Sequence, residues 1–217
     1  MRNVAKALVA LTILVWGSAA SAAVIYDNGI SAANSFVSDV DFPLFVADDF
    51  SLNAGANVIT DVHWTGLYFD SNTPQAADNF VIQFYADAGG APAVVPLLSF
   101  AIGNPGRTDT GTDLTGSDLF AYSVDIAPVV LAPATTFWIS IFNDTTGDAD
   151  DNWFWGMRDQ VGNSFTRPDF VSAWTLQGDG HEFSLTGPGA VPEPSSVVLL
   201  ALGGIGLLGW LRKLASR

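Results

Sequence analysis

The residues best suited to chemistry lie in one acidic stretch, NDTTGDADDNWFWG, residues 143–156. Asp148, Asp150 and Asn152 occupy alternate positions, the spacing at which a calcium loop turns successive oxygen ligands toward one ion. Asp144 offers a further carboxylate in the same stretch. An EF-hand is a poor match, because a tryptophan stands where that loop requires glycine. The sequence therefore predicts either an irregular calcium site or an ordinary solvated acidic loop.

Two tryptophans at the end of this stretch suggest a second kind of site. Trp153 and Trp155 share one face of an alternating segment, while Phe154 points to the other face. An exposed indole ring stacks on the apolar face of a sugar, and neighbouring carboxylates accept hydrogen bonds from its hydroxyl groups. The pair is thus a candidate sugar-binding platform, with a place in the protein core as the alternative.

Side chains for acid–base or nucleophilic catalysis are scarce. The chain has no cysteine, its two histidines are His63 and His181, and Glu182 is the one glutamate before the C-terminal segment. Asp48 and Asp49 are adjacent and point to opposite sides of a strand. The motifs of serine hydrolases, P-loop enzymes and zinc proteases are missing from the sequence. We expect a protein that is not an enzyme, and a glycoside hydrolase or lyase is the less favoured alternative.

The middle of the chain is strongly acidic. Residues 23–191 contain 20 aspartates and one glutamate against three arginines, a net charge of −18, and they contain no lysine. Such a surface repels phosphate backbones, which excludes nucleic acid as a partner. It also excludes attachment to an anionic membrane through a basic patch.

Alternation of apolar and polar residues with a period of two predicts strands along this middle part. The clearest segments are residues 58–69, 79–87, 119–126 and 135–144, and weaker ones are 24–27, 45–52, 94–102, 152–157 and 181–187. Gly66, inside the first of these, suggests a bulge or bend. Short segments rich in Gly, Pro and Asn separate the strands, and no window shows helical spacing with caps. The prediction is an all-β, antiparallel two-sheet sandwich of the jelly-roll-like kind.

The N-terminus has the three parts of a secretory signal peptide. Arg2 and Lys6 precede an apolar run at 7–16, and small residues follow at 17–23. We place cleavage after Ala22, so that residues 1–22 are removed. Residues 23–190 then form one acidic ectodomain, a normal size for a single core.

The C-terminal segment, residues 191–217, has the composition of a membrane anchor. Residues 194–211 are uncharged, and 18 residues at ~1.5 Å rise give roughly 27 Å, close to the ~30 Å core of a bilayer. We predict a transmembrane helix at about 195–211. The basic end, residues 212–217, belongs in the cytoplasm by the positive-inside rule, which puts the acidic domain outside.

This segment closely resembles the PEP-CTERM sorting signal. The resemblance is carried by Pro192, Glu193 and Pro194, by the uncharged run, and by Arg212 and Lys213 after it. It implies a Gram-negative bacterium, export by the general secretory route, and an inner-membrane precursor facing the periplasm. It further implies cleavage by exosortase, and association with extracellular polysaccharide or biofilm matrix at the cell surface.

The ectodomain is similar to an uncharacterised all-β domain found on proteins with this tail. The matching segments are FVADDFSL, DVHWTGLYFD, DNFVIQFYADAGGAP, RTDTG, LAPATTFWISIFND and NWFWG. That resemblance implies the fold and no activity. We therefore expect a non-catalytic surface or matrix protein, with a calcium-assisted carbohydrate-binding module as the alternative. Ca²⁺ is the one cofactor that the sequence suggests, and only in that alternative.

Overall fold

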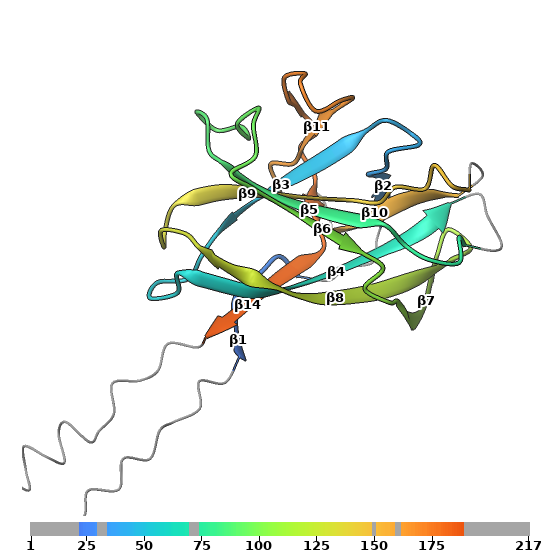
Figure 1. The fold of residues 1–217 in the computed structure, drawn as a ribbon, viewed down its shortest axis with the longest axis horizontal. Coiled ribbons are helices and arrows are strands. Elements are labelled where there is room, and N and C mark those ends of the chain that lie inside the picture. The colour runs from blue at the N-terminus through green and yellow to red at the C-terminus, as the bar shows by residue number, and fades with distance from the viewer. Residues whose placement is uncertain (1–21, 30–33, 70–73, 149–150, 159–161, 189–217) are drawn as a thin grey trace, which may run out of the picture. The chain divides into compact units, whose positions relative to one another are not determined.

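The computed structural model describes residues 22–29, 34–69, 74–148, 151–158 and 162–188, within the compact unit Ala22–Ala190. These residues form strands and loops (Figure 1). The strands are β1 (Ala22–Asp27), β2 (Asn34–Val37), β3 (Phe45–Ser51), β4 (Val58–Phe69), β5 (Phe80–Ala86), β6 (Leu98–Gly103), β7 (Thr108–Leu114), β8 (Ser117–Val130), β9 (Thr136–Phe142), β10 (Asn152–Arg158), β11 (Phe165–Arg167), β12 (Thr175–Leu176), β13 (Gly180–His181) and β14 (Phe183–Pro188).

The predicted end segments fall outside this part of the chain. The signal peptide up to residue 21, the sorting signal at 191–217 and the helix at about 195–211 are not among the described residues. Within the described ranges, no helix has the length and apolar character needed to cross a membrane.

The strands form two antiparallel sheets, as predicted. One sheet has six strands in the order β12-β11-β3-β9-β5-β6. The other has eight strands, with β4 at its centre, β8 along one edge of β4, and β7 beyond β8. All the paired strands in both sheets run antiparallel. The all-β, two-sheet prediction is confirmed, and the jelly-roll-like connectivity stays a prediction.

The second edge of β4 is shared by two strands placed end to end. β14 pairs with its first part, where Trp64 faces Phe183. β10 pairs with its last part, where Gly66 faces Trp155. Thr65 therefore lies at the junction between the two partners. This break in the edge positions the candidate site described below.

Aromatic rings fill the space between the two sheets. Trp64 and Tyr122 stack with centroids 5.4 Å apart and planes 8° from parallel. Phe80 meets Trp153 edge-on at 4.9 Å, and all four rings are buried. Such ring pairs add about 0.5–1.5 kcal/mol each beyond the burial of their apolar area. A domain without disulfides therefore has a substantial aromatic core.

Gly66 serves a purpose other than the predicted bulge. It is regularly paired on both edges of β4, and the irregularity against β8 falls between Ile59 and Asp61 instead. The indole ring of Trp153 packs directly on Gly66, because a Cβ there would lie 2.3 Å from the nearest ring atom. The glycine permits a close approach of ring to backbone.

Replacing Gly66 by alanine should therefore destabilise the fold. Neither the ring of Trp153, enclosed by other rings, nor the paired backbone of β4 has room to move. We expect Gly66→Ala to lower the free energy of unfolding by about 3 kcal/mol, measured by urea denaturation. Gly147→Ala is the control, since a Cβ there has no neighbour within 4 Å, and should change stability by less than about 0.5 kcal/mol. Equal effects of the two substitutions would refute this packing.

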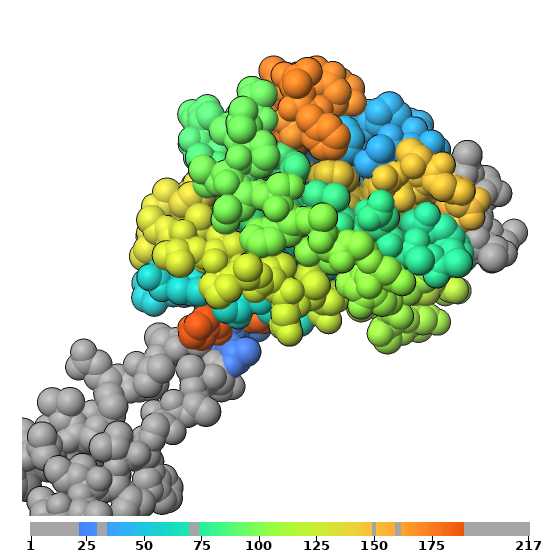
Figure 2. Space-filling model, viewed as in Figure 1, coloured from blue at the N-terminus to red at the C-terminus, as the bar shows by residue number. Residues whose placement is uncertain are grey.

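The loop between β5 and β6 and the loop between β11 and β12 lie side by side over the outer face of the six-stranded sheet. Figure 2 shows them as green and orange neighbours. Arg167, 1% exposed, joins them by donating from Nη1 to the carbonyl oxygen of Val94 at 2.8 Å. Its guanidinium lies 4.2 Å from the ring centre of Trp174. The loop tips expose Val95 and Val171. Arg167 is thus a structural residue that holds two loops together.

Candidate functional site

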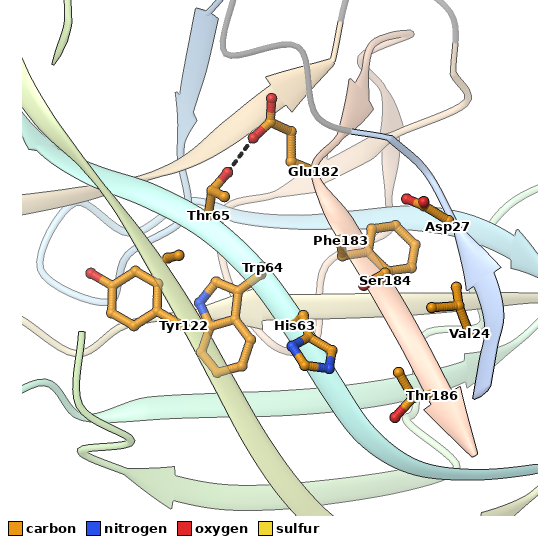
Figure 3. Close-up of a pocket in the computed structure, with 11 residues that line it drawn as sticks. Val24, Asp27, His63, Trp64, Thr65, Tyr122, Glu182, Phe183, Ser184 and Thr186 are labelled. Carbon is orange, nitrogen blue, oxygen red and sulfur yellow. Dashed lines mark hydrogen bonds between the residues drawn. The ribbon is translucent and has the colours of Figure 1, made fainter. Parts of the chain in front are cut away.

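A pocket of about 380 Å³ opens on the eight-stranded sheet (Figure 3). Its volume falls in the range of small-ligand sites. Strands β1, β4, β8 and β14, with Glu182 between β13 and β14, supply its lining, which combines apolar and polar side chains. The lining residues are Val24, Asp27, His63, Trp64, Thr65, Ala121, Tyr122, Glu182, Phe183, Ser184 and Thr186.

One end of the pocket is formed at the junction on β4. Thr65 Oγ1 donates a hydrogen bond to Glu182 Oε2, and the Glu182 side chain is fully buried. The backbone N–H of Glu182 donates to the carbonyl oxygen of Gly156 at 2.8 Å, which joins β10 to the start of β14. A Cβ at position 156 would lie 2.3 Å from Thr65 Oγ1. Glycine at 156 therefore leaves the room that this buried pair occupies.

The middle of the pocket carries an imidazole. His63 Nε2 lies 3.2 Å from Asp61 Oδ1, and the His63 side chain is 41% exposed. Burial raises the pKa of Asp61, the nearby His63 lowers it, and Asp125 raises it again. Asp125 lies directly opposite Asp61 on β8. His63 thus lines the pocket and also contacts one member of an acidic pair.

The other end of the pocket offers hydroxyl groups. Thr186 Oγ1 is buried and has no hydrogen-bond partner within the described ranges, and Ser184 lies two residues earlier on the same face of β14. Asp27 stands at the rim, where its Oδ1 accepts a hydrogen bond from the backbone N–H of Gly29 at 2.7 Å. The lining residues include two carboxylates and no lysine or arginine. This arrangement favours a neutral or cationic ligand over an anion.

The predicted calcium ligands are described only in part. Asp150 lies outside the described residues. Asp144 Oδ1 accepts hydrogen bonds from the backbone and hydroxyl of Thr146, and its Oδ2 accepts one from Asn79. Across the described ranges, no three acidic or histidine side chains gather as a metal site. The predicted set of Asp144, Asp148, Asp150 and Asn152 stays a prediction.

The predicted sugar platform does not fit the structure. Trp153 and Trp155 are both 0% exposed, so neither ring offers a face to a sugar in solvent. Trp155 Nε1 donates to the carbonyl oxygen of Glu182 at 2.9 Å, and Phe154 packs on the opposite face with Leu67. Both tryptophans belong to the core, which corrects the platform interpretation.

The buried carboxylate of Asp39 joins three segments, and no sequence pattern singled it out. Its Oδ1 accepts from Thr145 Oγ1 at 2.8 Å, and its Oδ2 accepts from the backbone N–H of Trp153 at 2.9 Å. The backbone N–H of Asp41 also donates to Oδ1. Burial nevertheless raises the pKa of Asp39 to about 6, and these hydrogen bonds counteract the rise only in part.

This raised pKa predicts an unusual dependence of stability on pH. Between the ordinary aspartate pKa of 3.8 and about 6, the folded chain holds a proton that the unfolded chain has released. Stability must then fall as pH rises through this window. Burial raises the pKa of Asp49, Asp61 and Asp78 as well, and these groups act with the same sign.

We expect the free energy of unfolding to be about 2–3 kcal/mol lower at pH 7 than at pH 4 on account of Asp39. Denaturation series across this range measure it. Asp39→Asn should flatten the slope, whatever its effect on absolute stability. An exposed control, Asp113→Asn, should leave the slope unchanged. Stability that increases from pH 4 to pH 7 would contradict the prediction.

The described residues form an all-β domain of two antiparallel sheets. Residues 190–213 match the family model of the PEP-CTERM protein-sorting motif, which covers Pro192, Glu193, Pro194, Arg212 and Lys213. The chain therefore carries this motif, which implies an exported protein with a membrane-anchored precursor that exosortase processes. Comparison with curated proteins and with solved structures found no match for the chain.

Proposed function

We propose that the chain is a non-catalytic surface or extracellular-matrix protein, associated with extracellular polysaccharide. Its acidic sandwich is exported, held by the C-terminal segment in the inner membrane, and cut by exosortase near Pro192 to Pro194. The matched sorting motif carries this proposal. The net charge of −18 in residues 23–191 supports it, since strong self-repulsion keeps an exported domain soluble.

The positions of the first and last strands of the sandwich support the same proposal. Ala22, where β1 begins, faces Pro188, where β14 ends. The sorting motif starts at residue 190, two residues beyond β14. Cleavage after Ala22 and again near Pro192 would therefore leave every described strand except the first residue of β1. The released product is then the whole sandwich.

The pocket carboxylates support the non-catalytic part of the proposal. Asp27 accepts from the backbone of Gly29, and Glu182 accepts from Thr65, so both are engaged in local structure. The purified protein should not cleave matrix polysaccharide. Turnover that disappears in a Glu182→Gln variant would overturn this part.

The sorting step is tested by replacing Pro192, Glu193 and Pro194 with alanine. We expect the variant to stay in the membrane fraction with its C-terminus intact, because the protease no longer recognises its site. Mass spectrometry of the C-terminus in membrane and extracellular fractions measures this. A control with Thr112→Ala on β7 should be released normally. A native extracellular protein that still carries Arg212 and Lys213 would contradict the proposal.

Carbohydrate binding in the pocket is a second candidate function. The pocket combines the imidazole of His63 with the hydroxyl groups of Ser184 and Thr186, and Thr186 Oγ1 has no partner among the residues that the structure describes. Sugars are neutral and rich in hydroxyl groups, which matches a lining without lysine or arginine. Calcium assistance, predicted from the acidic loop, is part of this candidate.

Glycan binding should depend on the pocket if this candidate is correct. We expect His63→Ala and Thr186→Val each to weaken binding by about tenfold, the equivalent of one or two lost hydrogen bonds. A glycan array with and without chelator identifies the ligand, and titration measures the loss. Asp113→Asn, on the β7–β8 hairpin, should bind as the original chain does. Absence of binding to any glycan in both conditions would remove this function.

A further inference from the structure

Asp151 is a buried carboxylate that has no side-chain hydrogen-bond partner in the described part of the chain. The residue is 0% exposed, and among the described residues no donor lies within hydrogen-bond distance of Oδ1 or Oδ2. A carboxylate taken out of water in this way is strongly unfavourable unless another group compensates it. A compensating group at this position would therefore stabilise the ionised carboxylate.

No basic side chain of the ectodomain supplies that group. Lysine is absent from residues 23–191. The three arginines have their partners elsewhere: Arg107 donates to the carbonyl of Gln75, Arg158 to Asn28 Oδ1, and Arg167 to the carbonyl of Val94. A compensating positive charge would then come from outside residues 23–191.

Asp39 shows that the same region can satisfy a buried carboxylate with its own donors. Its oxygens accept from Thr145 and from the backbone of Trp153, only two residues after Asp151. Asp151 receives no such donor. The next side chain, Asn152, also has an amide oxygen that is buried and without a partner. Adjacent residues thus present three oxygen acceptors that lack donors.

We propose that Asp151 anchors a Ca²⁺ site, with Asn152 Oδ1 as the second candidate ligand. Calcium accepts carboxylate, amide, carbonyl and water oxygens in irregular geometries. Since no three acidic or histidine side chains converge within the described ranges, neutral oxygens complete the coordination. A site with so few charges resembles the weak calcium sites of extracellular modules. The anchor differs from the four residues predicted from spacing, and it does not depend on the proposed function.

The test compares melting of the full-length chain in detergent with 10 mM CaCl₂ and with EGTA. Binding to the folded state alone should raise the melting temperature by about 5 °C. Asp151→Asn keeps the shape of the side chain and removes its charge. This variant should lose the response to calcium and should melt higher than the original chain in EGTA. Asp113→Asn, an exposed control, should keep the full response.

Two results would overturn the proposal: an unchanged melting temperature of the original chain in calcium, or an undiminished response in Asp151→Asn. An equal shift with MgCl₂ would also overturn the assignment to calcium. Should Asp151→Asn fail to fold, the original chain still gives a direct test. Terbium bound at Asp151 should emit on excitation of Trp153, two residues away, and calcium should displace it. Absence of this emission would refute the site.

Discussion

The hydrogen bond from the backbone of Trp153 to the buried carboxylate of Asp39 is the contact on which the centre of the sandwich depends. Asp39 holds the start of β10 next to the loop that contains Thr145. With its backbone fixed there, Trp153 places its indole ring on Gly66 of β4 and against Phe80. One hydrogen bond between a turn and the start of β10 thus helps to position the indole ring that packs on β4.

The pocket also depends on how strands pair along the edge of β4. Because β10 occupies only the last part of the β4 edge, β14 takes the first part, and Thr65 lies between them. The gap is filled by Glu182, whose side chain is long enough to reach Thr65 across the space left by Gly156. The polar face of β14 then stands beside His63 and forms the wall of the pocket. Strand pairing, rather than a loop, builds this site.

The sequence was most informative where a pattern is local. Alternation located β4 at residues 58–69 correctly, and the sorting motif was readable because its parts are consecutive in the chain. Alternation could not tell which face of β10 is buried. The sequence therefore could not decide whether Trp153 and Trp155 form a sugar-binding platform or belong to the core. β7 was missed because TDTGTDL has no apolar alternation; its pairing with β8 depends on the hairpin.

The Glu182–Thr65 pair could not be predicted from the sequence, because it depends on where β10 and β14 adjoin along the edge of β4. One signal was present nevertheless, since Glu182 is the only glutamate among the 21 acidic residues of the ectodomain. The partnerless carboxylate of Asp151 was hidden for a related reason. Spacing identifies oxygen donors along a loop, but only the fold shows which of them lack hydrogen-bond partners.

The placement of the arginines has a consequence for resistance to proteases after export. Proteases of the trypsin type cleave after lysine or arginine in exposed, extended segments. Arg167 is buried beneath Trp174, and Arg107 is held between the rings of Tyr68 and Phe120. With no lysine in residues 23–191, Arg158 is the one remaining basic residue with an exposed side chain. The folded domain therefore presents such proteases with almost no cleavage site.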